Sequence, residues 1–294
     1  MKINRQFLQI IPIILLVMSV LTANGQDDLL NMLDTKAATP EPVKATFKTT
    51  RIINGHSIEQ MAKRHLDFRI SHRFGYVNSG VDEFWGLDYA RIRLGLEYGI
   101  TDRLMVGIGR NNVGTKAVDG FVKYKLFRQT NTNSMPLSVS LLGTVAVALT
   151  PVEGTKTVTD RTTYCYQVLL ARKFTEAFSL QLNPTMIHRN QVESGGYNND
   201  IFALGLGGRI KLTKRTSFNF EYYYLFNPEK ASSDKLMNNI SLGFDIETGG
   251  HVFQLHFTNS YGMIEKDFIA AANSDWTKGY ISYGFNISRT FSFK

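Results

Sequence analysis

Charged side chains recur at every second position in several segments of the chain, a spacing that places them on one face of an extended strand. The basic ones are Arg69, Arg73, Arg91, Arg93, Lys123 and Lys125, and the acidic ones are Glu221, Asp245 and Glu247. A basic wall that faces an acidic wall creates a transverse field, and fixed charges of this kind select the ions that pass between them. These residues are therefore the candidate functional residues. The alternative is that they pair with one another and fill the interior of a structural barrel.

Histidine and serine side chains could support hydrolysis, if a histidine acted as the base for a serine nucleophile. His188, His251 and His256 are the histidines to consider. The chain has no Gly-x-Ser-x-Gly elbow, and no spacing makes one histidine and one serine obvious partners. Solvated or interfacial histidines are the favoured interpretation, and no catalytic residue is assigned.

Metal and cofactor chemistry has little support in the residue pattern. His251 and His256 point to opposite faces of an extended strand, and the sequence contains no His-Glu-x-x-His motif. The glycine-rich run at 205–208 lacks the Lys-Ser/Thr of a phosphate loop. Cys165 is the single cysteine, so an intramolecular disulfide is excluded. No metal and no cofactor are predicted.

The elements that must position the charged residues are short strands with a period of two. Between Leu66 and Phe74, apolar side chains alternate with Asp67, Arg69, Ser71 and Arg73, and similar segments follow to the end of the chain. The pattern predicts about twelve antiparallel strands. It also predicts short turns after the second, sixth, eighth and tenth strands, and polar connections of about nine to nineteen residues after the odd-numbered ones.

The N-terminus has the features of a secretory signal peptide. Lys2 and Arg5 precede an apolar run from Ile10 to Leu21, which is shorter than the ~20 residues of a spanning helix. Small residues at 23 and 25 then predict cleavage near Gly25, before Gln26. Cleavage removes the positive charges of Lys2 and Arg5, so the net charge changes from +8 to 8 − 2 = +6. The basic residues are scattered, which argues against a nucleic-acid partner.

Three regions follow from this division. Residues 1–25 are the signal peptide, residues 26–64 are a periplasmic N-terminal segment or partial plug, and residues 65–294 are the barrel. Three features favour lipid over water as the solvent of the outer face. They are the export signal, the small and polar residues that face the lumen, and the aromatic residues near the strand ends. Lipid offers no hydrogen-bond partner, so the sheet must close on itself. We therefore expect an all-β, closed, antiparallel, up-and-down transmembrane β-barrel in the outer membrane of a Gram-negative bacterium.

Several motifs between Phe47 and Gln129 are similar to those of one family. They are the runs at 47–59, 72–75, 84–88, 91–99 and 106–110. The chain resembles a Bacteroidota-type family of exported β-barrel proteins, catalogued as domain of unknown function 5777. The resemblance implies a barrel in the outer membrane, and it brings no established activity, substrate or catalytic residue.

The function expected from these observations is a narrow channel for passive passage of small polar or anionic solutes. An outer-membrane lipid-modifying hydrolase and a structural or partner-binding barrel are the alternatives, and an enzyme is the less favoured interpretation. The connection from Tyr261 to Lys278 could contact a partner or fold into the mouth. The expected partners are outer-membrane lipid, the barrel-assembly machinery and periplasmic chaperones, and small anionic solutes.

Overall fold

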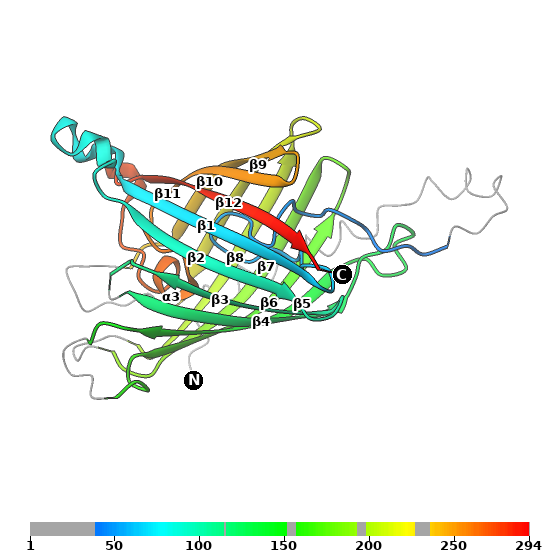
Figure 1. The fold of residues 1–294 in the computed structure, drawn as a ribbon, viewed down its shortest axis with the longest axis horizontal. Helices are drawn as coiled ribbons and strands as arrows, with labels where there is room; N and C mark the ends of the chain where they lie inside the picture. The colour runs from blue at the N-terminus through cyan, green and yellow to red at the C-terminus, as the bar shows by residue number, and fades with distance from the viewer. Residues whose placement is uncertain (1–38, 115, 152–156, 193–197, 227–235, 294) are drawn as a thin grey trace. The chain divides into compact units, whose positions relative to one another are not determined.

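Twelve antiparallel strands close into one barrel in the computed structural model (Figure 1). The strands are β1 (His65–Tyr76), β2 (Arg91–Gly99), β3 (Leu104–Asn111), β4 (Ala117–Phe127), β5 (Ser138–Ala148), β6 (Thr162–Lys173), β7 (Phe178–Arg189), β8 (Asp200–Lys211), β9 (Thr216–Leu225), β10 (Asn239–Thr248), β11 (His251–Thr258) and β12 (Ser282–Ser292). The structure describes residues 39–114, 116–151, 157–192, 198–226 and 236–293. The signal peptide and the cleavage position expected near Gly25 lie outside them.

The barrel is closed by the pairing of the first strand with the last. Each strand pairs with its neighbours in the sequence, and β1 pairs with β12 through residues such as Asp67 opposite Thr290 and Ile70 opposite Ile287. Because the ring of strands has no edge, the backbone groups find their partners within the sheet. The prediction of a closed, antiparallel, up-and-down barrel of about twelve strands is confirmed.

The two faces of the sheet differ in the way the alternation predicts. On β2, Arg93 and Glu97 are 1% and 0% exposed, whereas Leu94 and Leu96 between them are 46% and 44% exposed. The same contrast recurs on the other strands, where polar side chains are buried inside and large apolar side chains cover the outer wall. An outer wall of this composition suits lipid as its solvent.

Four of the five connections at one end are short, as the sequence predicts, and cover 100–103, 174–177, 212–215 and 249–250. The fifth, at 128–137 between β4 and β5, is longer. The prediction of a long connection after the third strand was wrong. β4 begins at Ala117, which leaves only residues 112–116 between β3 and β4. Gly120 points outward, at a position where the alternation requires an apolar side chain. The pattern is therefore interrupted near the start of β4, and the first residues of the strand are not recognised from the sequence.

Short helices occur in two of the connections. The 3₁₀ turns η2 (Val77–Ser79) and η3 (Val81–Gly86) lie between β1 and β2, and the helical turn α3 (Glu265–Phe268) and the 3₁₀ turn η4 (Trp276–Lys278) lie between β11 and β12. Within the described ranges, no helix has the length and apolar character needed to span a bilayer.

Leu94→Arg tests the assignment of the outer wall to lipid. Leu94 lies near the middle of β2 and points outward. An arginine at the midplane of a lipid-facing wall is expected to lower the free energy of unfolding by about 2–4 kcal/mol in lipid vesicles. Urea titration of the folded barrel measures this cost. The matched control is Phe291→Arg at the end of β12, where the cost is expected to fall to about 0–1 kcal/mol; equal costs at both positions would contradict the assignment.

Candidate functional site

Residues 46–58 lie inside the barrel, and their central part forms a tight hairpin, which we call the inserted hairpin (Thr50–Ser57). The Ser57 N–H donates to the Thr50 carbonyl at 2.9 Å, and the Ile52 N–H donates to the Gly55 carbonyl at 2.9 Å. Asn54 and Gly55 lie at the tip, and this pair of residues is typical of turns. Its described side chains are at most 4% exposed. Figure 1 draws this segment in blue among the strands.

Glu221 of β9 holds the tip of the inserted hairpin. Its carboxylate accepts hydrogen bonds from three consecutive backbone N–H groups, those of Ile53, Asn54 and Gly55, each at 2.9 Å. Hydrogen bonds to an ionised acceptor are stronger than those between neutral groups. Glu221 is therefore the main anchor of the hairpin tip.

The backbone carbonyls of the inserted segment are bound by side chains from four other strands. Gln254 of β11 donates to the Ile52 carbonyl at 3.0 Å, and Asn286 of β12 donates to the Ile53 carbonyl at 3.0 Å. The remaining donors are Gln181 of β7, which reaches the His56 carbonyl at 2.7 Å, and Lys123 of β4, which reaches the Ser57 carbonyl at 3.0 Å. Lys123 also donates to the carbonyl of Glu59, the residue after the segment, at 2.6 Å. The barrel wall thus satisfies the main chain of the segment from several sides.

Side chains of the hairpin add polar and apolar contacts. The Asn54 amide accepts from Arg73 at 2.7 Å and donates to Ser241 at 2.9 Å. The Ile52 side chain belongs to a buried apolar cluster, whose other members are Phe47, Ile58, Leu169 and Ala171. The hairpin is therefore fixed both by its tip and by the side chains that flank it.

Arg51 links the hairpin to the wall and to the last long connection. Its Nε lies 3.5 Å from Glu97 of β2, and its guanidinium lies 3.4 Å from Glu265 of α3. Glu97 also accepts a short hydrogen bond from the Thr50 hydroxyl and lies 4.0 Å from Arg69. One buried cation thus joins three separate parts of the chain.

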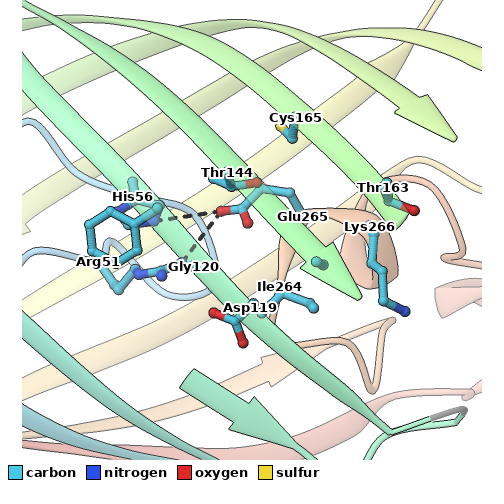
Figure 2. A pocket seen from close by; sticks show the side chains of 12 residues that line it. Arg51, His56, Asp119, Gly120, Thr144, Thr163, Cys165, Ile264, Glu265 and Lys266 are labelled. Atoms are coloured by element: carbon cyan, nitrogen blue, oxygen red, sulfur yellow. Dashed lines mark hydrogen bonds and ion pairs between the residues drawn. The ribbon is translucent and has the colours of Figure 1, made fainter. Parts of the chain in front are cut away.

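The connection between β11 and β12 folds inward beside the hairpin (Figure 2). Glu265 lies 3.8 Å from His56, and the Phe268 ring packs edge-on against Tyr223 of β9 with 5.3 Å between the ring centres. A cavity of about 10 Å³, roughly the space for one water molecule, lies among these groups. It is lined by Arg51, His56, Asp119, Cys165, Ile264 and Glu265, among other residues.

Burial shifts the pKa values of Glu265 and His56, which the β11–β12 connection and the inserted hairpin bring together. It raises the pKa of Glu265, although Arg51 acts in the opposite direction. It lowers the pKa of His56 well below its ordinary value, and the nearby cations Arg51 and Lys123 lower it further. His56 is therefore neutral at pH 7, and the ion pair of this region is that between Arg51 and Glu265.

The basic residues singled out in the sequence lie on inward positions of β1, β2 and β4, and most are already bound. Arg69 donates to Asp67 at 3.1 Å, and Arg93 forms a two-point contact with Asp119 at 3.0 and 2.5 Å. Lys123 binds the carbonyls of the inserted segment, as described above, and Lys125 lies half-buried further along β4.

Arg73 and Arg91 differ from the other cations in their partners. They are opposite each other on β1 and β2. Arg73 bonds to the amide oxygens of Asn54 and Asn286, and the Arg91 guanidinium lies 3.6 Å from the centre of the Tyr261 ring. In the described part of the chain, neither of them forms an ion pair with a carboxylate.

The acidic residues singled out in the sequence serve three separate contacts. Glu221 binds the hairpin tip, Asp245 accepts from Gln254 at 2.8 Å, and Glu247 pairs with Lys48 at 2.5 Å. Sequence reasoning did not include Asp67, Glu97 and Asp119 among the functional residues. These three residues occupy the same alternate, inward-facing positions of β1, β2 and β4 as the basic residues. That spacing could have identified them as counter-charges within the basic wall.

The three histidines considered for hydrolysis lie apart. His188 of β7 bonds to Asp200 of β8 at 2.7 Å on the outer face, His256 is buried inside the barrel, and His251 is exposed. Among the hydrogen bonds of the described residues, none joins a serine to any of the three histidines. The same residues contain no group of three or more histidine, cysteine or acidic side chains placed to hold a metal ion.

Solved structures that this chain resembles include porins and an outer membrane channel. The NanC porin is 12% identical, with 78% of this chain and 99% of that chain covered and a TM-score of 0.47. The KdgM porin in complex with disordered oligogalacturonate is 8% identical, with 78% and 99% covered and a TM-score of 0.46. An outer membrane channel from Pseudomonas putida F1 is 14% identical, with 79% and 97% covered and a TM-score of 0.47. A comparison with curated proteins found no match.

A family model described as a membrane bound beta barrel domain matches residues 47–291. The match includes all twelve strands except the last residue of β12, Ser292, and it begins within the segment that lies inside the lumen. It agrees with the resemblance seen in the sequence motifs, and it confirms that the barrel is bound to a membrane. The chain therefore belongs to the family of membrane-bound β-barrel domains designated DUF5777.

Proposed function

We propose that this protein is an outer-membrane channel for small polar solutes, in which the inserted hairpin restricts passage. The observation that carries the proposal is the polar interior of the barrel. Its inward side chains are predominantly charged, amide or hydroxyl groups, and many are less than 5% exposed because the hairpin and the last connection cover them. Without these two elements, the same groups would line a water-filled passage.

The size of the barrel supports this interpretation. Strand side chains alone fill the interior of a barrel of about eight strands, and a ring of twelve leaves additional space. The additional space is filled here by segments that bind through ion pairs and hydrogen bonds. Apolar packing of the same volume is often equally or more stabilising than buried ion pairs, so structural support alone does not explain a charged interior.

A mild preference for anionic solutes follows from Arg73 and Arg91. Most of the other cations of the basic wall are balanced by Asp67, Glu97 and Asp119 or bound to carbonyl groups. Among the described residues, Arg73 and Arg91 form no direct ion pair with a carboxylate, and they lie near the end of the barrel where the long connections emerge. Two adjacent cations at an entrance attract anions and repel cations.

The proposed location is the outer membrane, reached by export through a cleavable signal peptide. Strands that close into a barrel are the alternative to helices for crossing a bilayer, and bacterial barrels of this kind occur in outer membranes. The proposed partners are outer-membrane lipid, periplasmic chaperones and the barrel-assembly machinery, together with the small solutes that pass.

Charge selectivity in planar bilayers tests the proposal. A salt gradient across the membrane is expected to give a reversal potential of the sign for anion preference. Arg73→Gln combined with Arg91→Gln is expected to move it toward zero, because two adjacent cations at the proposed entrance are removed. The matched control replaces two exposed cations of the outer face, Arg110→Gln and Arg289→Gln, and is expected to leave it unchanged.

Two results would count against the channel. The first is an equal shift of the reversal potential in both pairs of variants, which would show that the preference comes from net charge rather than from the entrance. The second is the absence of conductance above bare lipid in both the wild-type protein and a variant whose hairpin has been released.

A further inference from the structure

We propose that the lumen wall around Glu221 is a peptide-binding site, which the inserted hairpin of the same chain occupies in this structure. The ligand class is a short peptide that can form a tight turn preceded by an aliphatic residue. This inference names a solute class for the proposed channel and so rests on the proposed function, but peptide binding can be measured without conductance.

The first argument is that the wall recognises main-chain groups. Glu221 binds three consecutive N–H groups, and Gln181, Gln254 and Asn286 each donate to a backbone carbonyl. These groups belong to every peptide and not to one sequence. Three successive N–H donors around one carboxylate are also a specific feature of a peptide turn, which sugars and simple ions do not offer.

The second argument is the cost of leaving the wall without a peptide. Glu221, Gln181, Gln254 and Asn286 are all at most 2% exposed, and they come from strands on different sides of the lumen. Buried polar groups require partners, and the hairpin supplies the three N–H donors of Glu221 and one carbonyl acceptor for each of the three amides. Once the hairpin leaves, the groups face water and are free to bind another main chain.

The third argument is a side-chain subsite beside the turn. Ile52 lies against Leu169 and Ala171 of β6, and it also faces Gly207 of β8. A Cβ atom at position 207 would collide with the end of the Ile52 side chain, so the glycine leaves the space that a branched side chain fills. The wall therefore combines main-chain recognition with a pocket for one aliphatic residue.

The experiment begins with a barrel from which the hairpin has been displaced. In Gly55→Val, the added side chain collides with the Tyr223 hydroxyl and the Glu221 carboxylate, while every wall residue stays unchanged. A second variant replaces residues 46–58 with a Gly-Ser linker of the same length. Peptide binding is measured on this variant if Gly55→Val does not fold.

The probe is a fluorescently labelled synthetic peptide with the sequence of residues 46–58. It is expected to bind the Gly55→Val barrel in detergent with a saturable change in anisotropy, and to block its conductance in bilayers. N-methylation of the peptide at the Asn54 and Gly55 nitrogens removes two of the three donors to Glu221 and is expected to weaken binding roughly tenfold or more. The control peptide carries Lys48→Ala, away from the turn, and is expected to bind within about threefold of the parent, because a partly exposed ion pair contributes little.

The outcomes separate the peptide site from the channel. No saturable binding of the parent peptide, or equal binding of the N-methylated peptide, would overturn the peptide site even if the variant conducts. Saturable binding that N-methylation weakens roughly tenfold or more supports the site. If that barrel still conducts no ions, it is the proposed channel function that fails.

Discussion

Replacing Glu221 with alanine is expected to release the inserted hairpin and to raise the single-channel conductance several-fold. The substitution removes the acceptor of three backbone N–H groups at once. Each hydrogen bond to a charged group contributes about 1.5–3 kcal/mol, and donors that remain buried without a partner add a further cost. Planar-bilayer recording of the purified protein measures the change directly.

Two further variants separate the anchor at Glu221 from a general loss of charge. Glu221→Gln keeps one carbonyl oxygen as an acceptor, so its conductance is expected to lie between those of the wild type and the alanine variant. Glu247→Ala removes a carboxylate that is 42% exposed and pairs with Lys48, and a pair of this kind contributes only about 0–1 kcal/mol. Wild-type conductance is expected there. If Glu221→Ala also kept the wild-type conductance, the hairpin would not be the element that restricts passage.

The barrel itself could be predicted from the sequence because lipid imposes a simple rule on it. Each strand must alternate between an apolar outer face and a polar inner face, so segments such as Leu66–Phe74 reveal both their conformation and their orientation. The short turn at 100–103 was predicted at its observed bounds for the same reason, because alternation stops where the strand ends.

The contents of the lumen could not be predicted in the same way. The bonds that hold the hairpin connect residues far apart in the chain, such as Ile53 with Glu221 and Asn286, and no local period records them. The alternation shows which charges point inward, but not which of them pair. For this reason the sequence suggested a basic wall, whereas Asp67, Glu97 and Asp119 balance much of it in the structure.

The wall and the hairpin use different bonds, and this separation is what allows the hairpin to move. The strands are joined to one another by backbone hydrogen bonds around the whole ring, including the closure of β1 on β12. The hairpin contributes no strand to that ring and is bound mainly by side chains of the wall. Its release therefore leaves the pairing of the sheet intact, and we expect the folded barrel to survive it.

Arg51→Met is expected to lower the free energy of unfolding by about 3–5 kcal/mol, because it removes one partner of a buried ion pair and leaves the other uncompensated. Arg51 lies between Glu97 and Glu265, and all three side chains are nearly inaccessible to solvent. The loss would be measured by urea titration in lipid vesicles at about pH 8. A change of less than about 1 kcal/mol would show that the pair contributes no more than an exposed one.

The pH dependence of the same variant identifies the carboxyl group that is left behind. Burial already raises the pKa of Glu265, and removal of Arg51 takes away the cation that opposes this shift. A carboxyl whose folded pKa is raised stabilises the folded state when it is protonated, and that contribution is lost as the pH rises through the raised pKa. The deficit of Arg51→Met is therefore expected to shrink as the pH falls from about 8 toward the ordinary glutamate pKa of 4.5. In the double variant with Glu265→Gln this part of the pH dependence should disappear, since the group that takes up the proton is absent; if it persisted unchanged, the proton would be binding elsewhere in the lumen.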